Sequence, residues 1–162
     1  MTYTDARYPE DCAEGLSPTV VAVTSLCGST LTNAPEWVSV LGFDYNHDFA
    51  SNLRFFLSGS VRYESERRTS TQSHVVPSSG TIVRQILSTE DIQDANTKVN
   101  LRLGIGGQDE RWALELWGTN IFDEQTRNVT FNIPLRGVAQ YAARGAFLEE
   151  PAIYGLTLRM NY

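Results

Sequence analysis

The chain has 162 residues, 20% of them charged, and a formal net charge of −6 at pH 7. This length suits one ordinary domain, and the acidity disfavours nucleic acid as a partner because phosphate binding needs a basic surface. No stretch approaches the roughly 18 continuous apolar residues of a membrane helix. The residues after Met1 have neither the basic nor the apolar region of a signal peptide, so we expect a mature form or a piece of a longer exported protein.

The first segment, Met1 to Tyr8, reads as the end of a strand, and a segment rich in Ser, Thr, Gly and Pro follows it. This segment predicts a long loop and contains both cysteines, Cys12 and Cys27. In an oxidising compartment a disulfide would close the loop and stabilise the fold by roughly 3 kcal/mol; the alternative is two reduced thiols. A metal site is not expected, because no His lies nearby and the spacing is wide.

Apolar and polar residues alternate in five further segments, and this period of two predicts strands with one apolar and one polar face. The second of them is about as long as a tilted membrane strand, which needs roughly nine to eleven residues. The segments are Trp37 to Asp48, Leu53 to Glu64, Val99 to Gly106, Trp112 to Asn120 and Ala152 to Tyr162.

The connections between these strands alternate between long and short. The short ones are His47 to Asn52 and Gly107 to Arg111; the long ones are Pro9 to Pro35, Ser65 to Asn96, with a short ordered piece near Ile82 to Leu87, and Gln125 to Pro151. Outer-membrane barrels sort their connections in this way, with short periplasmic turns and long extracellular loops. Four aromatic residues near strand ends fit the interfacial girdles of such barrels: Trp37, Tyr63, Trp112 and Tyr162.

The last strand carries an apolar or aromatic residue at every second position up to the final one: Tyr154, Leu156, Leu158, Met160 and Tyr162. A chain that stops on an aromatic in register with its apolar face favours the closing strand of an outer-membrane barrel over the edge strand of a soluble sheet. The predicted fold class is therefore all-β, with about six antiparallel transmembrane strands of a barrel.

Three pieces of the chain resemble the C-terminal portion of TonB-dependent outer-membrane receptors: Asn33 to Trp37, the Trp-Gly-Thr-Asn-Ile-Phe-Asp-Glu run from Trp117 to Glu124, and the closing Tyr154 to Tyr162. The resemblance covers nearly the whole chain, and Asn-Ile-Phe-Asp-Glu and the closing strand are its most specific parts. It implies a plugged barrel of about 22 strands in the bacterial outer membrane. Such a barrel imports a scarce nutrient, of the siderophore, cobalamin or carbohydrate class, with energy from TonB. The closing strand would then be similar to the signal that the barrel-assembly machinery recognises.

The chain departs from this family in strand number, because single-chain bacterial barrels start at roughly eight strands. Nothing in the sequence resembles the plug or the short segment that TonB grips. Six strands alone would expose two unpaired edges to lipid, at several kcal/mol for each backbone group. We therefore expect residues 1–162 to be the C-terminal part of a receptor. Its partners would be outer-membrane lipid, the rest of the barrel, the plug and, through the missing N-terminal part, the TonB complex.

On the barrel interpretation six charged residues are candidates to face the lumen: Arg54, Arg62, Glu64, Arg102, Glu115 and Arg159. We expect them to pair across strands or with the plug rather than to contact cargo. Choice of cargo would lie in the three long loops, because a scaffold leaves its loops free to vary.

No enzyme and no cofactor is expected, because His47 and His74 lack a Ser or Cys partner at a telling spacing. The acidic pairs Asp123-Glu124 and Glu149-Glu150 read as solvated loop charges rather than as calcium ligands. Two alternatives stay open. One is a soluble all-β binding module; the other is a small self-contained outer-membrane barrel, with extra strands from Val75 to Leu87 and from Thr130 to Ala139.

Overall fold

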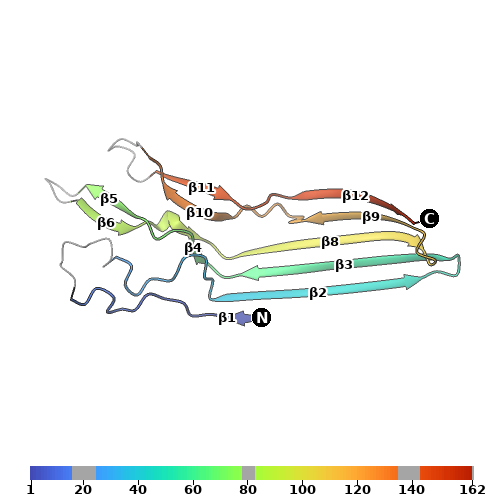
Figure 1. Ribbon diagram of the computed structural model, residues 1–162, viewed down its shortest axis with the longest axis horizontal. Helices are drawn as coiled ribbons and strands as arrows, with labels where there is room; N and C mark the ends of the chain where they lie inside the picture. The colour runs from blue at the N-terminus through green and yellow to red at the C-terminus, as the bar shows by residue number, and fades with distance from the viewer. Residues whose placement is uncertain (16–24, 78–82, 135–142, 162) are drawn as a thin grey trace.

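The computed structural model describes residues 1–15, 25–77, 83–134 and 143–161, and its largest part is one open antiparallel sheet (Figure 1). The all-β prediction and the six-stranded antiparallel sheet are confirmed. The sheet is not closed, because the strands at its two edges do not pair with each other. In sheet order the strands are β1 (Thr2–Tyr3), β2 (Trp37–Asp48), β3 (Leu53–Glu64), β8 (Asn96–Gly107), β9 (Trp112–Thr119) and β12 (Ile153–Met160).

Two tight turns join the long strands at one end of the sheet, where the C-terminus also lies (Figure 1). Asn52 closes the β2–β3 turn at φ 60°, a left-handed conformation that Asn tolerates better than most residues. Glu110 holds the same conformation, at φ 59°, in the β8–β9 turn. The two turns are tied together, because Gln108 donates its backbone N–H to Asn52 O over 3.0 Å and its side-chain amide to Phe49 O over 2.8 Å.

The other end of the sheet carries short hairpins where the sequence predicted long loops (Figure 1). The second connection contains β4 (Arg67–Arg68), β5 (Ser73–Pro77), β6 (Val83–Leu87), the 3₁₀-helix η1 (Thr89–Asp91) and β7 (Ile92–Gln93); the third contains β10 (Arg127–Asn132) and β11 (Arg144–Leu148). Strand β4 pairs with β7, β5 with β6, and β10 with β11. The expected ordered piece corresponds to β6, although Ile82 lies outside the described residues. The other strands have only two to six residues each, too few for an alternating pattern to stand out in the sequence.

These hairpins contradict the alternative of a small self-contained barrel. That alternative needed Val75 to Leu87 and Thr130 to Ala139 to add strands to the main sheet. As far as the two segments are described, they form separate two-stranded sheets. Strand β10 pairs with β11, in the register Thr130↔Ala146, and not with β9 or β12.

The first long loop is closed by a disulfide between Cys12 and Cys27, whose Cα atoms lie 5.4 Å apart. Residues 16–24 of this loop lie outside the described part. Isolated bridges pair Arg7 with Thr30 and Thr32 with Arg68, and they attach the loop to itself and to β4.

Within the described residues no hydrophobic side chain is fully buried, and the buried side chains are polar or charged. Leu53 and Leu156, which a soluble globule would enclose, are 36% and 69% exposed. A soluble all-β module is expected to enclose such side chains in an apolar core. In the same part of the chain, no helix is long and apolar enough to cross a membrane.

Candidate functional site

The register of the main sheet separates the residues of its strands onto two faces. Residues directly opposite each other in an antiparallel pair point to the same side, so each paired row can be followed across the sheet. One such row is Leu57, Leu103, Leu116 and Leu156, and a second is Phe55, Ile105, Leu114 and Leu158. Both rows are apolar from β3 to β12. We call this side the apolar face.

The apolar face also carries the closing residues that the sequence singled out. Tyr154, Leu156, Leu158 and Met160 lie on it, each at least 60% exposed, while Tyr162 lies outside the described residues. Of the predicted girdle residues, Trp37 and Tyr63 are exposed and Trp112 is half-buried. Trp112 lies directly opposite Met160 in the pairing of β9 with β12. His47 lies beside aromatic rings, 4.8 Å from Phe49, rather than beside a nucleophile.

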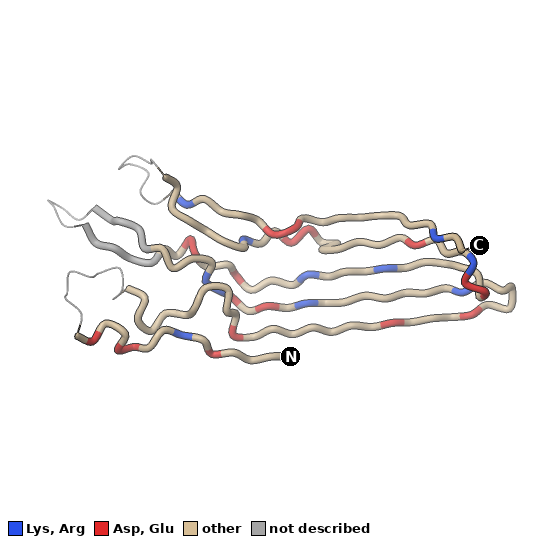
Figure 2. The backbone as a smooth tube through the Cα atoms, in the orientation of Figure 1, with Lys and Arg blue, Asp and Glu red and all other residues tan. Residues whose placement is uncertain are grey.

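The opposite side, which we call the polar face, carries all six lumen-facing candidates: Arg54, Arg62, Glu64, Arg102, Glu115 and Arg159. The structure therefore gathers these residues on one surface, and their position in a lumen stays a prediction. Figure 2 shows charged residues both at the ends of the long strands and part-way along them.

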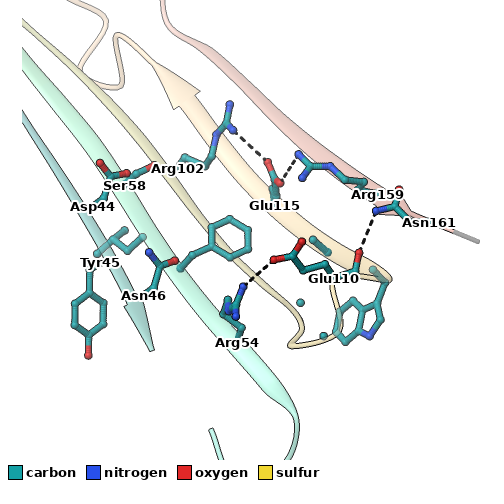
Figure 3. Close-up of a pocket in the computed structure, with 16 residues that line it drawn as sticks. Asp44, Tyr45, Asn46, Arg54, Ser58, Arg102, Glu110, Glu115, Arg159 and Asn161 are labelled. Carbon is teal, nitrogen blue, oxygen red and sulfur yellow. Dashed lines mark hydrogen bonds and ion pairs between the residues drawn. The ribbon is translucent and has the colours of Figure 1, made fainter. Parts of the chain in front are cut away.

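Near the turns, Glu115 on β9 lies between two arginines of the neighbouring strands (Figure 3). Arg102 Nη1 on β8 lies 3.5 Å from Glu115 Oε2, and Arg159 Nη2 on β12 donates to Glu115 Oε1 over 3.1 Å. The Glu115 side chain is only 6% exposed, whereas those of Arg102 and Arg159 are 54% and 58% exposed. One buried carboxylate thus fixes two guanidinium groups that remain open to solvent.

This triad lines a hollow of about 400 Å³ on the polar face (Figure 3). Arg54 lies in the same hollow, but its guanidinium is already paired, at 2.9 Å from Asp48 and 3.3 Å from Glu110. Strand β2 contributes Asp44 and Asn46 to the wall.

At the hairpin end, a second charge network joins the sheet to the connections. Glu149 accepts from Lys98 Nζ over 2.5 Å, from Thr126 Oγ1 over 2.8 Å and from Arg67, which in turn lies 3.8 Å from Glu64. Partial burial raises the pKa of Glu149, but these three donors together lower it to about 2. Glu149 is therefore ionised and engaged rather than solvated as the sequence suggested.

The most deeply buried charge is Asp91, in η1, whose exposed fraction is zero. Its carboxylate accepts three hydrogen bonds from Arg144 of β11, between 2.5 and 2.9 Å long, and one of 2.5 Å from Thr130 of β10. Its backbone carbonyl accepts from the hydroxyl of Thr69 over 2.9 Å. The cluster clamps the β10–β11 hairpin to the second connection. Nothing in the local sequence marks this pairing, because Arg144 lies 53 residues away from Asp91.

The Asn120 to Glu124 piece, one of the two most specific parts of the family resemblance, contains a turn that directly follows β9. Asn120 adopts φ 48° and donates its side-chain amide to Glu124 O and Glu150 O over 3.1 and 3.2 Å. Asp123 accepts from the backbone N–H of Ala152 over 2.9 Å. The piece fixes where β12 begins, which explains this composition without a bound ion. No cluster of possible metal ligands occurs in the described ranges.

Comparison with protein-family models, with curated proteins and with solved structures gave no match.

Proposed function

We propose that this chain forms part of the wall of an outer-membrane β-barrel, and that the barrel is a TonB-dependent receptor importing a scarce nutrient. The observation that carries the proposal is that the apolar side chains of this face are exposed or half-buried, and none is fully buried, across β2, β3, β8, β9 and β12. A contiguous apolar surface of this kind marks a site of contact with a membrane or a partner. Strands that alternate apolar-out and polar-in are the pattern of membrane barrels.

Two further features support a barrel wall rather than a protein–protein interface. Short turns lie at one end of the sheet and the long hairpin-bearing connections at the other, as in outer-membrane barrels. Both edges of the sheet also retain unpaired backbone groups, which in hydrocarbon need partner strands. The remaining wall and the plug would supply these partners, and TonB would act through the plug side.

The receptor assignment itself rests on the resemblance of the closing strand and of Trp117 to Glu124. In this proposal the barrel-assembly machinery recognises the closing strand through Tyr154, Leu156, Leu158 and Met160. The hairpins of the long connections recognise a siderophore, cobalamin or carbohydrate.

The test uses two adjacent apolar residues on opposite faces of β2, each well exposed: Leu41 on the apolar face and Val40 on the polar face. Leu41→Arg in the intact receptor should reduce insertion into the outer membrane, because Arg on the lipid face costs about 2–4 kcal/mol near the midplane. Val40→Arg should insert normally. Insertion is measured by heat-modifiable migration of the membrane fraction, and TonB-dependent uptake of the three nutrient classes is measured in the same cells.

Equal insertion of both variants would contradict the proposal that the apolar face contacts lipid. Normal insertion of the Val40→Arg protein, with nutrient uptake that does not depend on TonB, would support the barrel but contradict a TonB-dependent receptor.

A further inference from the structure

We infer that the Arg102–Glu115–Arg159 triad and the facing wall of its hollow bind a small carboxylate that also carries a hydroxyl or ammonium group. A role of this site in binding the transported nutrient inside the barrel rests on the proposed function. The binding itself rests only on the geometry of the cluster.

The first step is the charge that the triad leaves uncompensated. Two guanidinium groups share one buried carboxylate, so the group of three has a net charge of +1. A guanidinium has five N–H donors, and among the described residues each of these two arginines forms an ion pair or hydrogen bond only with Glu115. Most donors of these two residues, which line the hollow, therefore have no protein acceptor in the described part of the chain.

The second step is preorganisation. Arg102 and Arg159 lie on strands either side of β9, and the carboxylate of Glu115 lies between their two guanidinium groups (Figure 3). A guanidinium presents paired donors that match the two oxygens of a carboxylate. Because Glu115 restrains both side chains before a ligand arrives, less conformational entropy is lost on binding.

The third step is the opposite wall, which sets the rest of the ligand. Asp44, Ser58 and Arg102 lie directly opposite one another on β2, β3 and β8. Asp44 is exposed and makes no ion pair or hydrogen bond with the described part of the chain. Its carboxylate would repel an anionic group placed against it but accept from a hydroxyl or an ammonium. A ligand whose carboxylates lie on the two arginines and whose hydroxyl or ammonium group points toward Asp44 fits both walls.

The experiment is isothermal titration of the intact protein, folded in detergent, with L-malate, succinate and inorganic phosphate at low ionic strength, where charge screening is weak. Malate should bind saturably and more tightly than succinate, which lacks the hydroxyl. Arg102→Gln and Arg159→Gln should each weaken malate binding about tenfold or more, the effect of losing a charge-assisted pair of hydrogen bonds.

Arg62→Gln is the matched control, since Arg62 is a half-exposed arginine of the same face that pairs with Glu64 outside the hollow. It should leave malate binding unchanged. Asp44→Asn should reduce the preference for malate over succinate. If Arg102→Gln does not fold, Arg102→Lys keeps the charge beside Glu115 and loses the paired donors, so weaker malate binding is expected there as well.

Absence of saturable malate binding would overturn the inference, and so would equal losses in the Arg62→Gln and Arg102→Gln proteins. Phosphate binding as tight as malate binding would do the same, because it would show a general anion surface. The titration does not depend on membrane insertion. Malate binding can therefore survive a failure of the Leu41→Arg test, and the two proposals fail separately.

Discussion

At the scale of single residues, charged groups occupy the interior positions of this protein and apolar groups its surface. Glu149 illustrates the energetic consequence. Its side chain is 23% exposed and its pKa is lowered to about 2 from an ordinary 4.5. A carboxyl whose pKa is lower in the folded state stabilises that state at any pH above its unfolded value. The stabilisation is lost as the pH falls from about 4.5 to about 2.

We therefore predict that Glu149→Gln lowers the free energy of unfolding by about 2 kcal/mol at pH 7, after allowance for solvent screening. The difference from the unmodified protein should shrink as the pH falls through that window. The measurement is chemical denaturation in detergent at pH 7, 4 and 2.5. Glu150→Gln, at the exposed neighbouring position, is the control. A pH-independent difference would mean that the ionised form of Glu149 does not stabilise the fold.

At the scale of elements, the hairpins beyond the sheet depend on buried polar contacts. The β10–β11 hairpin turns Phe147 and Leu148 to the solvent and its Thr130 and Arg144 toward Asp91. Removing one partner of a buried ion pair lowers the free energy of unfolding by much more than the pair contributes to stability, because the other charge stays buried without a partner. The orientation of the hairpin thus rests on a few side chains.

Asp91→Asn should therefore destabilise the clamp by about 3–5 kcal/mol and speed amide hydrogen exchange in β10 and β11, with little effect in β3 and β8. The double variant Asp91→Asn/Arg144→Gln should lose less than the sum of the two single variants. Glu90→Gln, at the exposed position next to Asp91, serves as the control. Unchanged exchange in the hairpin of the Asp91→Asn protein would show that backbone pairing alone holds it.

At the scale of the whole molecule, the free edges of the sheet determine what else must be present. Strand β1 pairs with only the first two residues of β2, at Trp37 and Val38, and β12 pairs only with β9. The rest of the outer edge of β2 and the outer edge of β12 have no partner in the described residues. An unpaired edge is costly in lipid and invites pairing with another strand.

We predict that, in the intact receptor, alternate amides of β2 from Val40 to Asp48 exchange as slowly as those of the central strand β8. The same holds for the alternate amides of β12 that point away from β9. The measurement is hydrogen exchange of the detergent-solubilised protein, with the β2–β3 turn as a fast-exchanging reference. Fast exchange at both edges beside slow exchange in β8 would indicate an open sheet and contradict a closed barrel.

The central sheet was predictable because its signal is local. The strands from Trp37 to Asp48 and from Leu53 to Glu64 have the predicted bounds, and the two tight turns lie where they were expected. The six charged candidates share one face for the same reason, since a period of two assigns each residue to a side before any partner is known.

The hairpins and the clamps were not predictable in this way. Strands as short and polar as β4 and β7 carry no periodic pattern. Contacts from a distant residue support them: the guanidinium of Arg127 donates to Ile92 O over 2.8 Å, and its backbone N–H donates to Gln93 Oε1 over 2.7 Å. The triad in the hollow is a similar case: the sequence placed Arg102, Glu115 and Arg159 on one side without indicating that they meet.

The amino-acid sequence by itself determined the strand positions, the two faces and the closing pattern of β12, because contact with water or with apolar surroundings is recorded at every second residue. Only the tertiary structure decided which charges are buried and how the outer hairpins attach. Those features join residues that are far apart in the chain, such as Arg67 and Glu149, 82 positions apart. Their proximity follows from the way the connections fold together at one end of the sheet and leaves no local trace.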